Sequence, residues 1–272
     1  MRIAGVEIAA AQLMRGGDIC QAWNGTYGTS SDQMVFAKTL ERAPAGLFAA
    51  EARGLDLLRV EGGPPIPLVI AVADDGLVLE WVEPAAPAPV LARDFGRRLA
   101  TLHTSRLPSF GAAVDGFIGP LPLPNAPAGS WSEFYVERRL RPFMSALSAA
   151  ERVAVEEVCA RIDEIAVPVE PPARIHGDLW SGNVLWGRSA VWLVDAASAH
   201  GGHRETDIAM LALFGVPYFD EILNGYCEIA PLSDGWRERI PLHQLHPLLV
   251  HATLFGGGYG ARAASAARSL LR

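Results

Sequence analysis

The segment HGDLWSGN at residues 176–183, followed by the apolar run VWLVD that ends at Asp195, is the strongest constraint on this chain. Asp178 precedes the amide Asn183 by five residues, and the turn residues Gly187-Arg188-Ser189 predict a hairpin between Asn183 and Asp195. Asp178 can accept a proton from a hydroxyl, while Asn183 and Asp195 offer the oxygen ligands that Mg²⁺ prefers. Each acid alone could simply cap a strand or turn. The joint spacing instead predicts a kinase-type phosphoryl-transfer site that uses ATP and Mg²⁺.

A lysine and a glutamate in the first third of the chain form a second candidate group. Residues 33–40 alternate like a strand, in which Lys38 extends a row of apolar side chains on one face. In the helix predicted from Gly46 to Val60, Glu51 falls on an apolar stripe of leucines. Lys38 alone could be an ordinary strand-end lysine, but an unpaired carboxylate on an apolar stripe is costly. The pattern therefore predicts a Lys38–Glu51 ion pair that holds the ammonium for nucleotide phosphates.

The other nucleotide contacts are less defined, because the chain contains no GxGxxG and no GxxxxGK followed by Ser or Thr. Gly16-Gly17 could form a turn over the phosphates or an ordinary hairpin, and the sequence leaves both open. The run from Leu79 to Val82 precedes a proline-rich connector, where a kinase hinge would offer backbone groups to adenine. We therefore expect Gly16, Gly17, Glu80 and Val82 to lie at the nucleotide.

The order of strand-like and helix-like segments predicts an α+β fold of two lobes. Up to residue 83 the chain is turn-rich and strand-like, with Asp74-Asp75-Gly76 as the turn of a predicted hairpin. The Pro/Ala-rich stretch 83–90 then interrupts regular structure. Beyond it, helical spacing dominates, and one helix is predicted to contain Val155, Val158, Ile162 and Ile165. We predict a protein-kinase-like fold, with a β-rich nucleotide-binding lobe over residues 1–83 and a helical catalytic and substrate lobe over residues 84–272.

Composition narrows the classes of partner. A net charge of −7 and a pI near 5.5 argue against nucleic-acid binding. The three cysteines are far apart in the sequence, which indicates neither a disulfide framework nor a zinc site and fits a reducing cytoplasm. The longest stretch without formal charge, residues 240–261, contains prolines and histidines and reads as a buried helix pair rather than a membrane span. Composition leaves the oligomeric state open.

Several further segments, together with the catalytic pattern, resemble those of a known family. The chain is similar to the fructosamine kinase (ketosamine-3-kinase) family, within the larger aminoglycoside-phosphotransferase-like group. The catalytic loop is shared with other small-molecule kinases, and the combination with the additional segments is more specific. These segments are FIGPLP at 117–122, SWSEFYVERRLRP at 130–142, GGHRETDIAM at 201–210 and LFGGGY at 254–259.

The resemblance implies an ATP-dependent kinase that phosphorylates the third hydroxyl of a sugar joined to an amine through a ketosamine linkage. The phosphorylated adduct is unstable, so the implied activity is deglycation of a small-molecule or protein-bound ketosamine. By position in the family's motifs, Asp178 is implied to be the catalytic base, and Asn183 and Asp195 the magnesium ligands. Lys38 and Glu51 are implied to anchor the phosphates.

Three residues are candidates for contact with the substrate. Trp180 follows the implied base and could lie against a sugar face or belong to the core. His203 and Glu205, in the segment 201–210, are expected at the substrate, although acids there could also stabilise a helix start or buttress the catalytic loop. His176 is expected to be structural.

The chain departs from the family pattern at two positions. Ala196 stands where a proline is usual after the implied metal ligand. Asp18 stands where many relatives carry a cysteine after the glycine pair, which puts cysteine-based redox control of that loop in doubt even though Cys20 is close by.

Two alternative functions remain at this level. A phosphotransferase for aminoglycosides or other small amino alcohols would share the catalytic loop but should lack the additional segments. A nucleotide-binding pseudokinase usually loses the base, a metal ligand or the lysine, and this chain keeps all three types of residue.

Overall fold

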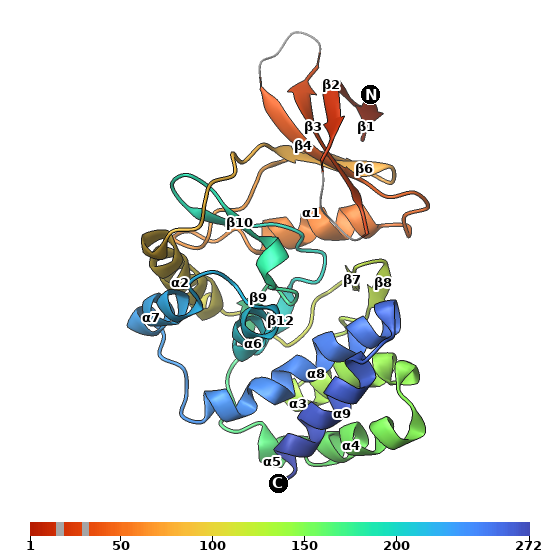
Figure 1. The fold of residues 1–272 in the computed structure, drawn as a ribbon, viewed down its shortest axis with the longest axis vertical. Helices are drawn as coiled ribbons and strands as arrows, with labels where there is room; N and C mark the ends of the chain where they lie inside the picture. The colour runs from red at the N-terminus through yellow and green to blue at the C-terminus, as the bar shows by residue number, and fades with distance from the viewer. Residues whose placement is uncertain (15–18, 29–32) are drawn as a thin grey trace.

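The computed structural model describes residues 1–14, 19–28 and 33–272. Its N-terminal part is a six-stranded antiparallel sheet in the order β1-β2-β3-β4-β6-β5, drawn in red to orange at the top of Figure 1. The strands are β1 (Arg2–Ile3), β2 (Val6–Leu13), β3 (Gln21–Tyr27), β4 (Met34–Thr39), β5 (Val69–Ala73) and β6 (Gly76–Glu80). The predicted strand over residues 33–40 is thus confirmed as β4. The predicted hairpin is also confirmed, because β5 and β6 pair with Ala73 opposite Gly76.

Helix α1 (Leu47–Leu57) lies beneath this sheet (Figure 1). The predicted stripe is confirmed as its buried face, and it consists of Leu47, Glu51, Leu55 and the following Leu58. The helix also packs against a loop of the C-terminal part. A Cβ atom at Gly54 would lie 1.7 Å from the carbonyl oxygen of Ala196 in that loop. Only glycine permits this close approach. It brings the helix that carries Glu51 against the residue that follows Asp195.

The C-terminal part is mainly helical and occupies the lower half of Figure 1. Its helices are α2 (Pro89–Thr104), α3 (Trp131–Phe134), α4 (Ala149–Ala160), α5 (Ile162–Ile165), α6 (Glu205–Phe214), α7 (Phe219–Ile229), α8 (Trp236–Phe255) and α9 (Tyr259–Leu270). A π-helical turn (Tyr135–Leu140) and two 3₁₀ turns (Arg141–Ala146 and Ser181–Asn183) complete the set. The Pro/Ala-rich connector ends at α2, whose first residue is Pro89. Proline is favoured at this position because it lacks an N–H group, and the first N–H groups of a helix have no partner within the helix.

One predicted helix is divided in two. The apolar stripe that includes Val158 and Ile162 was expected on a single helix, but Arg161 leaves helical geometry at φ −112° and ψ 15° and separates α4 from α5. The stripe still packs on one side, since Val155, Val158 and Ile162 are all buried. The spacing of apolar residues indicates which face is buried, but it does not reveal that a single residue within the segment departs from helical geometry.

Three short antiparallel strand pairs lie among the helices. β7 (Gly116–Ile118) pairs with β8 (Leu121–Leu123), β9 (Ala173–Ile175) with β12 (His200–Gly202), and β10 (Val184–Trp186) with β11 (Val191–Leu193). The β10–β11 pair confirms the hairpin predicted around Gly187-Arg188-Ser189. It fixes the separation between the loop that carries Asp178 and the end of β11, where Asp195 follows.

The apolar core continues across the predicted lobe boundary. One cluster includes Phe48 and Leu55 of α1, Leu99 of α2 and Leu193 of β11. Because the sheet and α1 precede residue 83 and the long helices follow it, we keep the two lobes 1–83 and 84–272 as a proposal. Within the described part of the chain, no helix combines the length and apolar character needed to cross a membrane.

Candidate active site

A cavity of about 940 Å³ lies between the sheet with α1 and the helical part. Its lining brings together five polar residues from positions far apart in the sequence, as the sequence analysis predicted. They are Lys38, Glu51, Asp178, Asn183 and Asp195. Phe36 and Lys38 both line the cavity, so the face of β4 that period two indicated is the face that borders it.

Lys38 connects the two halves of this cavity. Its Nζ lies 2.6 Å from Oε2 of Glu51 on α1 and 2.6 Å from Oδ1 of Asp195. The predicted Lys38–Glu51 ion pair is therefore present, and Lys38 also contacts an implied metal ligand. Burial alone would lower the pKa of Lys38, but the two carboxylates raise it above its ordinary value, so the ammonium stays charged. Burial raises the pKa of Glu51 to about 7, against the opposing effect of Lys38.

Asp195 follows β11 in an unusual backbone conformation. Its φ is +63°, in the left-handed region that residues other than glycine seldom adopt. Half of the side-chain surface is exposed to the cavity side, although Oδ1 contacts Lys38. Burial would raise the pKa of Asp195, but the charge and hydrogen bond of Lys38 hold it below its ordinary value. Asp195 is therefore an ionised carboxylate with an accessible oxygen, as a magnesium ligand requires.

The loop that carries Asp178 is organised by Asn183. Nδ2 of Asn183 donates to the backbone carbonyl of Asp178 at 2.8 Å and to its Oδ2 at 3.4 Å. These bonds use the amide nitrogen and leave Oδ1 as the atom that can bind a metal ion. Burial, and then the negative charge of Asp195, raises the pKa of Asp178 well above its ordinary value. A carboxylate with a raised pKa is suited to accept a proton from a hydroxyl.

Asp207, in the first turn of α6, holds the same loop from behind. Its two oxygens accept from the backbone N–H groups of His176, at 2.8 Å, and Gly177, at 2.9 Å. Nε2 of His176 lies 2.9 Å from the carbonyl of Val194, next to Asp195, which agrees with the structural role expected for His176. Of the acids in segment 201–210, Asp207 is thus the one that buttresses the catalytic loop.

The donor set suits Mg²⁺. Among the residues around Lys38, three carboxylates (Glu51, Asp178 and Asp195) face one ammonium, so two negative charges are uncompensated when all are ionised. Carboxylate and amide oxygens are the preferred ligands of hard divalent cations. Lys38 is the only Lys or Arg side chain that lines the cavity within residues 1–14, 19–28 and 33–272. ATP phosphates therefore require a further cation at this position.

The other predicted nucleotide contacts have different outcomes. Glu80 and Val82 line the cavity, with Trp81 between them. Oε2 of Glu80 accepts from the backbone N–H of Leu68 at 2.9 Å, and the backbone N–H of Glu80 donates to the carbonyl of Leu68, also at 2.9 Å. Contact of Glu80 and Val82 with a nucleotide stays a prediction. Gly16 and Gly17 lie outside the described residues, and their contact with the nucleotide stays a prediction.

Trp180 borders the cavity beside Asp178. Its side chain is 37% exposed, so it is no core tryptophan, and this removes one of the two readings left open by the sequence. Its ring packs over Gly182, where a Cβ atom would lie 2.3 Å from the indole, and edge-on to Phe214 at 6.4 Å between centroids. The position suits contact with a sugar face.

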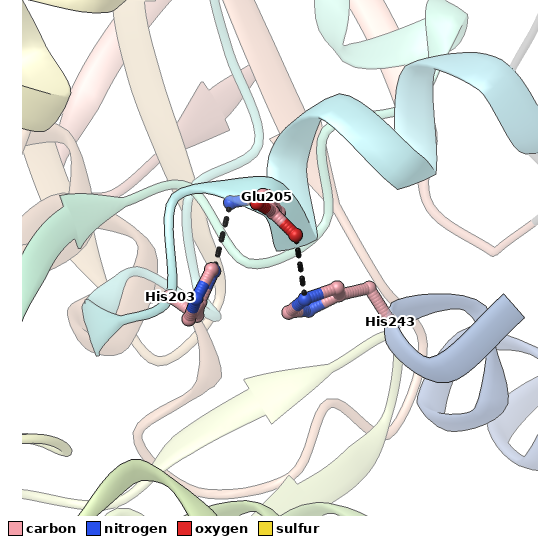
Figure 2. Close-up of side chains that lie close together, drawn as sticks. All are labelled: His203, Glu205 and His243. Carbon is pink, nitrogen blue, oxygen red and sulfur yellow. Dashed lines mark hydrogen bonds and ion pairs between the residues drawn. The ribbon is translucent and has the colours of Figure 1, made fainter. Parts of the chain in front are cut away.

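His203 and Glu205 occupy a different place from the one expected. Both are buried, and neither is among the described residues that line the cavity. Figure 2 shows them with His243 of α8: His203 Nδ1 accepts from the backbone N–H of Glu205, and Oε2 of Glu205 lies 3.4 Å from Nε2 of His243. Arg239 contacts both oxygens of Glu205, at 2.6 and 2.9 Å. The structure gives no support to a direct substrate contact by His203 or Glu205.

His203, Glu205 and His243 could also be read as a metal site, because their ligand atoms lie within 4.8 Å of one another. Burial, reinforced by His243, lowers the pKa of His203 to about 3, and burial lowers that of His243, so both rings are neutral, as metal ligands must be. The guanidinium of Arg239 argues against the metal site. Burial would raise the pKa of Glu205, but its bonds to His243 and Arg239 lower it to about 2. Arg239 therefore already neutralises Glu205, and a metal cation would lie beside a guanidinium.

The sequence analysis missed an aromatic part of the cavity. Four rings, which we call the aromatic wall, line it from α6, α8 and α9: Phe214, His251, Phe255 and Tyr259. Phe255 and Tyr259 belong to the LFGGGY segment, whose aromatic residues were the available signal. Cys20 also lines the cavity, and burial raises its pKa, which keeps the thiol protonated.

Comparison with known proteins identifies the family. The sequence profile of the family described as fructosamine kinase matches residues 2–272. The "probable ketoamine kinase" of Thermus thermophilus is 37% identical over 261 residues, which cover 95% of this chain and 94% of that protein. The "probable ketoamine kinase" YniA of Escherichia coli K12 is 34% identical over 260 residues, covering 92% of this chain and 89% of that protein.

Solved structures of related proteins support the same family and fold. A structure from Thermobifida fusca with a provisional fructosamine-3-kinase description has a TM-score of 0.92 and 46% identity, and covers 99% of this chain and 96% of that chain. The aminoglycoside phosphotransferase APH(4)-Ia has a TM-score of 0.66 at 14% identity and covers 97% of this chain and 95% of that chain, which shows the fold alone. The predicted α+β protein-kinase-like fold is confirmed.

Proposed function

This chain belongs to the fructosamine kinase family and is a phosphotransferase of the kinase-like fold, and we propose that it transfers the γ-phosphoryl group of ATP to the 3-hydroxyl of ketosamines. The observation that carries the proposal is the contact of Lys38 with both Glu51 and Asp195 in the cavity that Asp178 and Asn183 also line. This arrangement can hold a metal–nucleotide complex and accept a proton within one site.

Asp178 acts on the acceptor in this proposal. Its carboxylate takes the proton of the sugar hydroxyl while the hydroxyl oxygen bonds to the γ-phosphorus and the bond from that phosphorus to ADP breaks. Asn183 fixes the loop through its bond to the Asp178 carbonyl, and Asp207 fixes it through the N–H groups of His176 and Gly177. A base held from both sides keeps its orientation during proton transfer.

Lys38, Asn183 and Asp195 act on the nucleotide side. Glu51 holds the Lys38 ammonium at the cavity, where it can contact phosphate oxygens. Asn183 Oδ1 and the accessible oxygen of Asp195 are the atoms that would hold Mg²⁺. Held there, the ion would offset the negative charge of the phosphates during transfer. Adenine contacts the backbone carbonyl of Glu80 and the backbone of Val82 in this proposal, which is supported by the position of both residues in the cavity lining.

The distribution of charge favours a ketosamine over an aminoglycoside. All formally charged side chains that line the described part of the cavity are Lys38, Glu51, Glu80, Asp178 and Asp195. None lies on α6, α8 or α9, which form the wall farther from the phosphates. An aminoglycoside carries several ammonium groups, and burying them without carboxylates is costly. A ketosamine carries a single amine and a polyhydroxylated sugar, which Trp180 is placed to contact.

The proposed reaction leads to deglycation. Loss of a proton from the first carbon of the product gives an enaminol with a double bond between the first and second carbons, so phosphate can leave from the adjacent third carbon. Water then hydrolyses the resulting imine and releases the amine. The acceptor is a small-molecule ketosamine in this proposal, and protein-bound ketosamines are a second class to be compared with it.

The test is a turnover assay with purified protein, ATP and Mg²⁺. The panel contains fructosamines, ribulosamines, erythrulosamines and aminoglycosides, with phosphorus NMR to locate the new phosphate ester. The proposal expects phosphorylation of at least one ketosamine on its third hydroxyl. Phosphorylation of aminoglycosides with no ketosamine turned over would replace it with the alternative function.

A further inference from the structure

The aromatic wall is one connected surface. His251 lies at its centre, with ring-centroid distances of 4.8 Å to Phe214, 5.5 Å to Phe255 and 5.0 Å to Tyr259. Phe214 in turn contacts Trp180, next to the proposed base. The rings therefore form a continuous series from the catalytic loop to the outer edge of the cavity, where Phe255 is 52% exposed.

The surroundings of this wall are apolar. The adjacent lining residues of the same elements and of β7 contribute further hydrophobic surface, namely Phe117, Ile118, Met210, Val250 and Leu254. His251 Nδ1 lies 2.7 Å from the carbonyl of Pro247, a partner that can only accept, so that nitrogen carries a hydrogen. Among the described residues, this apolar and aromatic surface contains no formally charged lining residue, which favours a ligand group of the same character.

The reacting hydroxyl limits where each part of a ketosamine can lie. That hydroxyl must reach Asp178, and Trp180 is placed beside the sugar. The remaining part of the molecule is the substituent on the amine, and the series of rings leads away from Trp180 through Phe214. The single ammonium of the linkage can lie against ring faces, which attract cations.

We infer that the aromatic wall binds the amine substituent of the ketosamine, and that this substituent is an uncharged apolar group, aromatic or aliphatic. The inference rests on the proposed function, since it concerns the acceptor of that reaction. Substituents with a carboxylate or a second ammonium would lose water without gaining a partner in the lining. Outside the lining, the guanidinium of Arg262 lies 5.5 Å from the centre of the Tyr259 ring and would further disfavour a second ammonium.

The test compares four adducts of one sugar, prepared from benzylamine, hexylamine, glycine and the ε-amine of lysine. We expect kcat/KM for the benzylamine and hexylamine adducts to exceed that for the other two by at least about tenfold, mainly through KM, given the usual gain from burying a side chain of this size. Phe255→Ala should reduce the ratio of the benzylamine to the glycine adduct at least about threefold.

A matched control separates a local effect from a general one. Ile229→Ala truncates a side chain that is also 52% exposed, at the end of α7 and outside the cavity lining, and should leave the substrate ratio unchanged. Equal kcat/KM for all four adducts would overturn the inference and leave the proposed function intact. A preference for the glycine adduct would overturn it in favour of carboxylate binding by Arg262. Failure to phosphorylate any of the four, prepared in turn with each of the three sugars of the panel, would remove the proposed function, and the inference with it.

Discussion

Two buried groups of ionisable residues differ in how their charges balance. Around Lys38, three carboxylates face one ammonium and border the large cavity. Around Glu205, one carboxylate is paired with Arg239, and the neighbouring rings of His203 and His243 are neutral. We call them the Lys38 group (Lys38, Glu51, Asp178 and Asp195) and the Glu205 group (His203, Glu205, Arg239 and His243). The Lys38 group borders the cavity and has two uncompensated negative charges when all of its carboxylates are ionised. In the Glu205 group the charges balance and the residues are buried.

The difference separates a site that needs a ligand from one that does not. Burying an unbalanced charge is unfavourable unless a partner arrives, so the Lys38 group is prepared for a cation. The Glu205 group already satisfies its charge and joins α8 to the start of α6, two residues before Asp207 holds the catalytic loop. We therefore assign catalysis and metal binding to the Lys38 group and a structural role to the Glu205 group.

The largest expected effect belongs to Asp178. Asp178→Asn should lower kcat by roughly 10²–10⁴-fold, because the amide cannot accept the proton. The affinity for MgADP, measured by calorimetry, should change little. Asp163→Asn, at an exposed position on α5, is the matched control and should retain wild-type kcat. A folded Asp178→Asn protein with wild-type kcat would contradict the assignment of the base.

Arg239→Met tests the structural role of the Glu205 group. The change leaves Glu205 buried without its partner, which should lower the free energy of unfolding by about 3–5 kcal/mol. Below the melting temperature, kcat/KM per folded molecule should stay close to wild type. Arg237→Met, at an exposed position of α8 two residues before Arg239, removes only a cation–π contact with Trp236 and should change stability by no more than about 1 kcal/mol. If Arg239→Met instead abolished turnover at unchanged stability, the Glu205 group would belong to the active site.

A double-mutant cycle examines the ion pair within the Lys38 group. Lys38→Met and Glu51→Gln should each lower kcat/KM, the first more strongly, because in the proposed site Lys38 contacts phosphate and Glu51 only positions Lys38. Since the two groups lie 2.6 Å apart, their effects should be non-additive by about 0.5–3 kcal/mol. Full additivity in kcat/KM would show that Glu51 does not act through Lys38.

The pH profile should show the raised pKa of Asp178. Burial and the charge of Asp195 favour the protonated acid, and only the ionised form can accept a proton. Activity should therefore be lost as the pH falls through a value above the ordinary aspartate pKa of about 3.9. The measurement is kcat/KM against pH at saturating Mg²⁺, with Asp163→Asn as the reference protein. An acid limb at or below the ordinary value would contradict the predicted shift.

The sequence predicted those contacts that depend on local periodicity. The alternation of β4 and the stripe of α1 were enough to pair Lys38 with Glu51, and the spacing from Asp178 to Asn183 and the β10–β11 hairpin located the other implied ligands. Both kinds of signal are short-range, so one stretch of chain contains the information. The divided helix at Arg161 shows the limit of that signal.

Other contacts depend on how distant elements pack. Asp195 contacts Lys38 across 157 positions of sequence, and the approach of α1 to Ala196 depends on Gly54, which no local pattern singles out. His203 precedes α6 and Glu205 begins it, but Arg239 and His243, which contact Glu205, come from α8. The aromatic wall likewise joins three helices, and the sequence could not place its rings on one surface.

Calorimetric titration of ATP in the presence and absence of Mg²⁺ tests most directly whether the uncompensated charge of the Lys38 group serves a metal–nucleotide complex. Chelator in excess should weaken ATP binding at least about tenfold, which corresponds to 1.4 kcal/mol, because the carboxylates repel the phosphates. In Asp195→Ala this dependence on Mg²⁺ should shrink, whereas in Arg239→Met it should match the wild type. Equal affinity with and without Mg²⁺ in the wild-type protein would contradict the assignment of this group as the metal–nucleotide site.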